Sequence, residues 1–179
     1  MRSFSPLLAA CALLADYGTA APLTERHTPS SDSLTVKTNL FTVKGAIFPN
    51  ETNVRFFGNI PYAEPPIGKL RFRPPVTVKP RNETINGTWF GASCMQYNSG
   101  SATVYSEYLT GFLLSPGQKT SEDCLTLNVW APASSKEGDK LPVMIWIHGG
   151  GFTSGGAASP YKYGDRIVRD QNVIVVALK

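Results

Sequence analysis

The chain has 179 residues, of which 42% are hydrophobic and 17% charged, a composition typical of one folded domain rather than of a disordered segment. Its net charge is +4, from 17 Lys and Arg against 13 Asp and Glu. The basic residues are scattered and form no recognisable nucleic-acid-binding module, so no nucleic-acid partner is expected.

Residues 1–20 have the pattern of a secretory signal peptide. Met1 and Arg2 give a positive start, Leu7 to Ala15 form an apolar run, and small residues lead to an expected cleavage after Ala20. A buried N-terminal helix is the alternative. No stretch reaches the roughly 18 apolar residues that a membrane span needs, so no transmembrane segment is predicted. Residues 21–33 are expected to be a flexible lead-in to a domain over residues 34–179.

Removal of a signal peptide would leave two cysteines, Cys94 and Cys124. An even number in an oxidising compartment favours a disulfide, with two free buried thiols as the alternative. Three Asn-x-Ser/Thr sequons begin at Asn50, Asn82 and Asn86, and in an exported chain they predict glycans on surface loops, unless they occur by chance. The predicted location is therefore extracellular.

Strands dominate the next part of the chain. Residues 34–48 alternate apolar and polar side chains and predict a strand or a hairpin, and Val54–Phe57 predicts a short strand. Residues 58–81 are rich in Pro and Gly, which argues against a regular helix or a central strand there. If this stretch is ordered, side chains must hold it.

Residues 95–123 lie between the two cysteines. Apolar residues at 104, 105, 108, 109 and 112 follow a helical spacing, which an ordinary core helix would also show. Residues 125–130 alternate and predict a strand, followed by a polar turn over 134–140. Residues 142–147 are apolar on both faces and predict a buried strand that pairs antiparallel with the preceding one.

The last part of the chain combines a helix with a strand. Ser159 followed by Pro160 is a helix-start signal, and it predicts a helix to about Asp170 with Ile167 and Val168 facing inward. Residues 173–178 predict another buried strand. Strand, glycine-rich loop, helix and strand form the order of a parallel α/β unit.

Three consecutive glycines, Gly149 to Gly151, follow the strand that ends at Ile147. Such bare backbone favours a ligand held close to main-chain N–H groups. The spacing fits neither glycine-rich phosphate-binding motif, and His27 and His148 are the only two histidines, so no metal and no other cofactor is predicted. An oxyanion hole, whose N–H groups stabilise a developing alkoxide, fits better, with a plain glycine-rich turn as the alternative.

Three stretches resemble signatures of the type B carboxylesterase family, which includes lipases and cholinesterases. They are NIPYAEPPIGKLRFRPP from Asn59, EDCLTLNVWAP from Glu122 and PVMIWIHGGGF from Pro142. The departure is Asn59, where glycine is usual. The resemblance covers about residues 36–178 and implies the N-terminal portion of an α/β-hydrolase fold, with a mixed, mostly parallel central sheet and an N-terminal antiparallel β region.

The resemblance also implies a catalytic role for the glycine loop and a frame around it. Gly150 and Gly151 would be the oxyanion-hole donors, and Cys94 would pair with Cys124. The loop inside that disulfide would form a lid over the acyl site of a carboxylic ester substrate. The residues expected to face this substrate are Tyr105, Tyr108, Leu109 and Phe112.

Arg71 and Glu122 are expected, from the same resemblance, to form a buried ion pair that pins the Pro-rich segment onto the sheet. The sequence alone only permits this pairing, and both side chains could equally be exposed. If the pair is buried, removing one partner should cost about 3–5 kcal/mol, because the other charge is left unpaired.

The catalytic triad of that family is absent from these 179 residues. The G-x-S-x-G motif of the nucleophile does not occur, and the acid and the histidine would follow it in the chain. We therefore expect a truncated domain that is inactive by itself and has unpaired edges on strands 142–147 and 173–178. The alternative within the same fold is a secreted, non-catalytic binding or adhesion module. The oligomeric state is left open.

Overall fold

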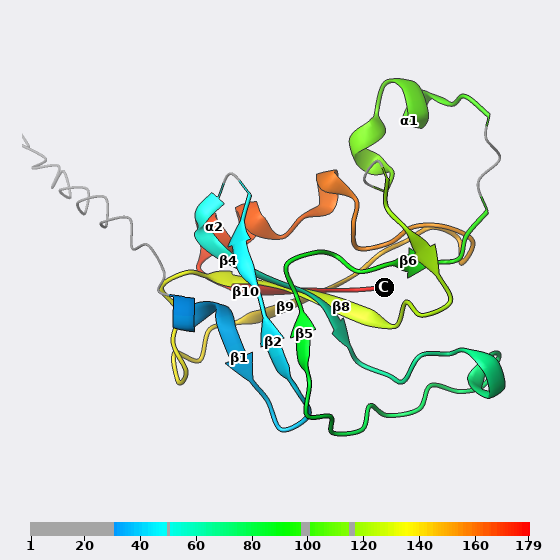
Figure 1. Cartoon of the computed structure of the whole chain (residues 1–179). Coiled ribbons are helices and arrows are strands. Elements are labelled where there is room, and N and C mark those ends of the chain that lie inside the picture. Colours follow the sequence, from blue (N-terminus) through cyan, green and yellow to red (C-terminus); the bar gives the residue numbers. More distant parts are fainter. Residues whose placement is uncertain (1–30, 50, 98–100, 115–116) are drawn as a thin grey trace, which may run out of the picture.

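A computed structural model describes residues 31–49, 51–97, 101–114 and 117–179 (Figure 1). The predicted signal peptide, most of the lead-in and the sequon residue Asn50 lie outside this part of the chain. The strands are β1 (Thr35–Lys37), β2 (Thr42–Lys44), β3 (Ala46–Phe48), β4 (Glu51–Pro61), β5 (Thr84–Asn86), β6 (Ser93–Cys94), β7 (Thr120–Ser121), β8 (Thr126–Pro132), β9 (Val143–Ile147) and β10 (Ile174–Leu178). The α-helices are α1 (Val104–Glu107) and α2 (Asp165–Gln171), and the 3-10 helices are η1 (Ser31–Leu34), η2 (Gly68–Leu70), η3 (Thr110–Phe112) and η4 (Pro160–Lys162).

The central sheet has the strand order β3-β4-β8-β10-β9. It is mixed, as predicted, but among the described strands of this sheet only β10 and β9 pair in parallel, whereas β3/β4, β4/β8 and β8/β10 are antiparallel. The expectation of a mostly parallel sheet is therefore wrong for these residues. Two parallel strands need a long crossover connection between them. Among these strands, only the connection from β9 to β10, which contains α2, joins two neighbouring strands in this way.

The predicted antiparallel pairing of the strands at 125–130 and 142–147 is also wrong. β10 lies between β8 and β9, and it pairs with β9 along its whole length and with β8 from Val175 to Leu178. For the same reason β10 has no free edge, so only β9 keeps the unpaired edge that the sequence predicts for both strands. The polar turn between β8 and β9 is present, with Gly138 at φ 91°.

β4 extends four residues beyond the predicted short strand, so Gly58 to Pro61 belong to an interior strand of the sheet, and the expectation that residues 58–81 contain no such strand is wrong for them. A register shift against β8 between Phe57 and Ile60 accommodates this irregular stretch. Asn59 lies in the shift with φ 54°, in the left-handed region that asparagine tolerates better than most residues with a side chain. This backbone angle explains both the glycine usual in the family at this position and why asparagine can replace it.

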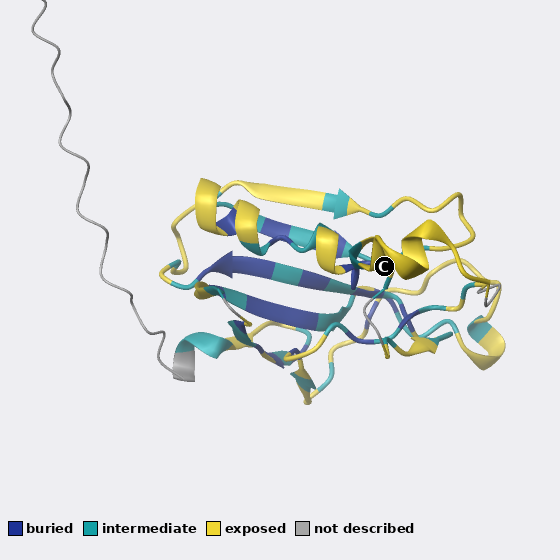
Figure 2. Ribbon diagram, turned by 90° about the horizontal axis from the view of Figure 1, so that it is seen from above, coloured by how far each residue is buried: buried dark blue, intermediate teal, exposed yellow. Residues whose placement is uncertain are grey.

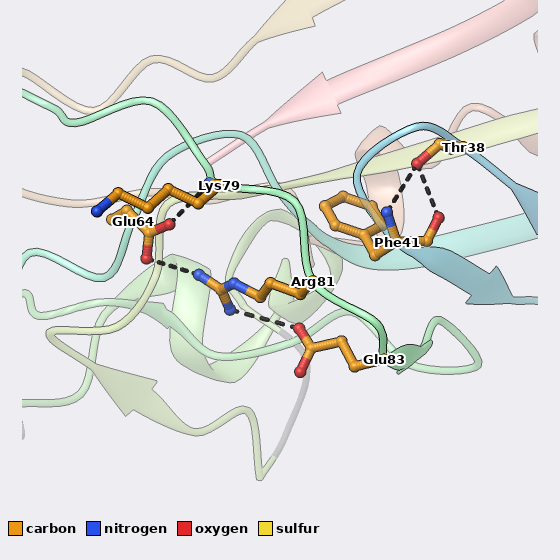
Figure 3. Close-up of polar contacts among 6 residues, drawn as sticks. All are labelled: Thr38, Phe41, Glu64, Lys79, Arg81 and Glu83. Carbon is orange, nitrogen blue, oxygen red and sulfur yellow. Dashed lines mark hydrogen bonds and ion pairs between the residues drawn. The ribbon is translucent and has the colours of Figure 1, made fainter.

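The N-terminal hairpin is present, as predicted. β1 pairs antiparallel with β2, and β2 pairs in parallel with β5 to make a small second sheet. The turn closes on Thr38, whose hydroxyl donates to the Phe41 carbonyl (2.7 Å) and accepts from the Phe41 N–H (3.1 Å), as Figure 3 shows.

The Pro-rich stretch is held by side chains, as the sequence requires. The Glu64 carboxylate accepts from the Lys79 N–H (2.9 Å) and from the Arg81 guanidinium (2.6 Å), and Arg81 also contacts Glu83 (3.4 Å), as drawn in Figure 3. These donors lower the pKa of Glu64, the backbone N–H most strongly. The bonds join the two ends of the long loop that contains η2.

Two hydrophobic clusters cover the two faces of the sheet. Successive residues of β4 and β8 point to opposite faces, so that Phe56 and Trp130 enter one cluster while Phe57 and Val129 enter the other. In the first cluster Trp130 is fully buried, and its ring centroid lies 5.3 Å from that of Phe56. The small sheet covers the second cluster.

The sequence predicts a buried strand at 142–147, but β9 is largely exposed along the margin of the sheet (Figure 2). Its side chains are apolar on both faces, and among them only Trp146 is partly buried, packed against the first cluster. In α2, Val168 is buried as predicted, whereas Ile167 is 39% exposed and the prediction for it is wrong. The helix-start signal at Ser159 and Pro160 begins the short 3-10 helix η4. The predicted single helix is then interrupted, and α2 begins after its N-cap residue Gly164. Among the described residues no helix has the length and apolar character that a membrane crossing requires.

Candidate active site

The glycine loop closes on one carbonyl group directly after β9. The Gly150 carbonyl oxygen accepts from the N–H groups of Thr153 and Ser154, both at 3.1 Å. The hydroxyls of Thr153 and Ser154 point to the same oxygen, at 3.2 and 3.4 Å. The loop is thus a tight turn whose shape is fixed by its own backbone.

Two of the three consecutive glycines have positive φ values, which favour glycine. Gly150 has φ 138° and Gly151 has φ 59°. A Cβ on Gly150 would also overlap the carbonyl of Ser154, whereas one on Gly151 would meet no atom within 4 Å and would project into open space. The glycine at position 150 is therefore explained by backbone angle and close packing, whereas at Gly151 only the positive φ favours glycine.

The N–H groups of Gly150 and Gly151 donate to no acceptor in the described part of the chain. Both residues line a hollow of about 390 Å³. The other residues around this hollow are Cys94, Met95, Gln96, His148, Gly149 and residues 152–155. Two backbone donors without partners in the described part of the chain therefore belong to residues that line a space large enough for a small acceptor.

The disulfide between Cys94 and Cys124 forms one wall of this region. The two Cα atoms are 5.0 Å apart, and 30 positions separate the residues in the chain. β6 and β7 pair in parallel just inside it, so the ends of the intervening loop meet. The pairing that the resemblance implies is present in the structure.

Gln96 is a site residue that sequence reasoning does not identify. Its side-chain oxygen accepts from the Gly155 N–H (3.1 Å), and its side-chain nitrogen donates to the Gly155 carbonyl (2.9 Å) and to the Cys94 carbonyl (3.2 Å). Nothing in the sequence singles out this glutamine, because the Gly155 backbone that it binds is about sixty residues away.

The residues expected to face the substrate do not line the hollow. The helical stripe breaks after α1, because Leu109 has φ −117° and ψ 42° and η3 follows. Tyr105, Tyr108, Leu109 and Phe112 are all exposed, which removes the alternative of an ordinary core helix within the described residues. Figure 1 shows α1 above β6, at one end of the molecule.

This loop nevertheless contacts the segment that follows the glycines. The Phe112 ring stacks on that of Tyr161 with 4.1 Å between the centroids, and the buried Ser159 hydroxyl donates to the Gly111 carbonyl (3.0 Å). Tyr105 meets the edge of Phe112 at 6.2 Å. The disulfide loop and the segment after the glycine loop are therefore packed together at two places.

Arg71 and Glu122 form the expected ion pair, but they are not buried. Two nitrogen atoms of the guanidinium donate to the two carboxylate oxygens, at 3.2 and 3.0 Å, while the side chains are 52% and 41% exposed. Water screens both charges, so the pair contributes at most about 1 kcal/mol rather than the value for a buried pair. The Pro-rich segment lies at the surface of the described structure, and this position accounts for the difference.

The two sequons in the described part of the chain, at Asn82 and Asn86, are on the surface. Asn86 ends β5, and its side-chain oxygen accepts from the Thr88 hydroxyl (2.7 Å). No group of three or more potential metal ligands occurs among the described residues.

Comparison with known proteins gives consistent matches. The model of the Carboxylesterase family matches residues 32–179. The chain is 44% identical over 153 residues to chlorogenic acid esterase of Aspergillus niger, covering 83% of this chain and 29% of that protein. It is 38% identical over 147 residues to acetylcholinesterase of Electrophorus electricus, covering 81% of this chain and 23% of that protein. It is 39% identical over 161 residues to cocaine esterase of Homo sapiens, covering 89% of this chain and 26% of that protein. The chain thus spans about a quarter of the length of these relatives.

Proposed function

This chain belongs to the carboxylesterase family, whose members are serine carboxylic ester hydrolases, and from that premise we propose that it forms the oxyanion hole of a secreted enzyme of this kind. In ester hydrolysis the attack of a nucleophile leaves negative charge on the former carbonyl oxygen. N–H groups fixed about 3 Å from that oxygen stabilise the charge as it develops. Gly150 and Gly151 are the proposed donors.

The observation that carries the proposal is the pair of unengaged N–H groups beside the hollow. The turn that presents them is fixed by bonds to the Gly150 carbonyl, so the donors need little reorganisation when charge appears. A donor of this kind stabilises the transition state by roughly 3–4 kcal/mol, equivalent to about 10²–10³ in kcat. The absence of a Cβ on Gly151 leaves room for the substrate to approach.

The 179 residues contain no G-x-S-x-G motif. We propose that they hydrolyse no ester unless another segment supplies the serine, the acid and the histidine. The relatives are named for different esters, so only the substrate class, carboxylic esters, carries over to this chain. Secretion is supported by the disulfide, since such bonds persist in oxidising compartments.

The loop inside the disulfide is proposed to form the rim of the acyl site. Its support is the packing of Phe112 on Tyr161 and of Gly111 on Ser159, which attaches the loop to the segment directly after the glycines. The exposed rings of Tyr105 and Tyr108 would then be available to an ester that approaches the hollow.

A chimera tests the proposal. Residues 32–179 replace the matching segment of the Aspergillus niger chlorogenic acid esterase, which supplies the remaining chain, and a chromogenic short-chain ester measures turnover. We expect the chimera to be active and the 179-residue chain alone to be inactive. Turnover by the isolated chain that a serine-directed phosphonate abolishes would contradict the proposal. A folded but silent chimera would favour a non-catalytic binding module.

Two glycine substitutions make a matched pair in the chimera. Gly151 and Gly138 both have positive φ values, 59° and 91°, and a Cβ at either would meet no atom within 4 Å. Gly138→Ala is therefore a control for backbone strain, which is at least as large at φ 91° as at φ 59°. We expect kcat to fall about 100-fold in Gly151→Ala, by obstruction of the donors, and to stay within about twofold in Gly138→Ala. Equal losses in both would refute the assignment of Gly151.

A further inference from the structure

Gln96 joins two segments that the fold brings together at the hollow. It lies two residues after Cys94, inside the disulfide loop, and Gly155 ends the glycine loop. The side-chain amide of Gln96 makes one accepted and one donated bond with the backbone of Gly155, at 3.1 and 2.9 Å. Two bonds to the backbone of one residue fix both its distance and its orientation.

Gly155 is in turn packed against the beginning of the same loop. It has φ 109°, and a Cβ there would overlap the Gly149 carbonyl and crowd the His148 ring. The backbone of Gly155 therefore lies directly against the residues that precede the proposed donors. A displacement of Gly155 toward Gly149 would press on the Gly149 carbonyl, which belongs to the same peptide group as the N–H of Gly150.

The side-chain amide of Gln96 is also bonded within its own loop. Its side-chain nitrogen donates to the Cys94 carbonyl (3.2 Å), and Cys94 is held by the disulfide and by the pairing of β6 with β7. A covalent bond, a glutamine amide and the glycine loop thus form one continuous series of contacts. The Gln96 side chain is only partly exposed, so its bonds compete with few water molecules.

We infer that Gln96 is the positioning residue of the glycine loop and sets the orientation of the Gly150 and Gly151 N–H groups. The inference rests on the proposed function for its catalytic meaning, because those groups are the proposed oxyanion donors. Gln96 itself touches no reacting atom. It holds the loop in the turn that leaves both N–H groups without an acceptor in the described part of the chain, beside the hollow.

Amide signals of the full chain, labelled with 15N-glycine, test the inference by NMR. Gln96→Met keeps the length of the side chain and removes its hydrogen bonds. Gln118→Met is the matched control, because Gln118 belongs to the same disulfide loop and donates to the Gly91 carbonyl (2.5 Å) without contacting the glycine loop. We expect the Gly155 amide to exchange about tenfold faster in Gln96→Met, and the Gly150 and Gly151 signals to shift. Neither change is expected in Gln118→Met.

A third variant supplies a rescue that a purely structural role would not show. In Gln96→Glu the protonated carboxyl can still make both bonds to Gly155, one accepted and one donated, and gives up only the donated bond to the Cys94 carbonyl, whereas the carboxylate faces the Gly155 carbonyl without a proton. The Gly150 and Gly151 signals should therefore match the wild type at low pH and depart from it as the introduced carboxyl ionises. His148 lines the same hollow, and the wild type over the same pH range gives its contribution.

The result would overturn the inference if the Gly150 and Gly151 signals stay unchanged in Gln96→Met, or move equally in Gln118→Met. Should Gln96→Met not fold, the pH response of Gln96→Glu decides by itself. The NMR signals are recorded without any ester or nucleophile. A chimera that shows no ester turnover would therefore disprove the proposed function without changing the NMR evidence that Gln96 positions the loop. Conversely, unmoved glycine signals would reject Gln96 as the positioning residue while the comparison of Gly151 with Gly138 still tests the oxyanion hole.

Discussion

The disulfide allows one stability prediction to be worked out from the structure. Replacing both Cys94 and Cys124 by Ala releases a loop of 30 positions in the unfolded chain. In the chain-entropy model the loss is (2.1 + 1.5R ln n) cal/mol/K, which for this loop amounts to about 3.6 kcal/mol at 25 °C. For a chain of this length the melting temperature should fall by roughly 7–14 °C.

Urea unfolding followed by tryptophan fluorescence measures the change, since Trp130 is buried in the first cluster. The wild type in reducing buffer should show the same loss as the double variant, and the double variant should not respond to the reductant. The Gly155 amide should also exchange faster in both, because Gln96 loses its fixed neighbour Cys94. A loss below about 1 kcal/mol would refute the reasoning, because it would mean that the unfolded chain gains little freedom from the released loop.

Three further changes probe the sheet and the Pro-rich loop. Asn59→Ala should cost about 1 kcal/mol, because alanine lacks the polar side chain with which asparagine tolerates φ 54°, while Asn59→Gly stays within about 0.5 kcal/mol in urea unfolding; equal effects would contradict the backbone explanation. Trp130→Ala should cost about 3–5 kcal/mol, and Trp130→Phe clearly less, because the buried indole nitrogen has no partner among the described residues and its loss breaks no bond. The stabilisation from Glu64 depends on pH, because the Lys79 N–H and Arg81 lower the pKa of this carboxyl in the folded state. The contribution to stability is therefore present above about pH 4.3, the ordinary glutamate pKa, and is lost as the pH falls through the folded-state pKa. Glu64→Gln should flatten that acid limb of the stability curve, and an unchanged limb would show that the carboxylate does not contribute.

Local chemistry along the chain determines much of the fold. The hairpin over 35–44, the strand at 126–132, the turn at Gly138 and the side-chain restraint of the Pro-rich stretch all follow from patterns within a few residues. The glycine loop is likewise evident in the sequence, since positive φ and close backbone approach leave few other residues possible. Signals of this kind are visible in sequence because neighbouring residues alone determine them.

The remaining features depend on which segments meet in space. Apolar faces predict that β9 is buried and paired with β8, yet β10 lies between them, because strand order depends on the crossover and not on sequence proximity. The helical spacing at 104–112 does not produce one helix, since that loop packs on Tyr161 instead of a core. Gln96 cannot be identified from the sequence at all, because a side-chain amide has no partner until tertiary structure brings a distant peptide group within hydrogen-bond distance.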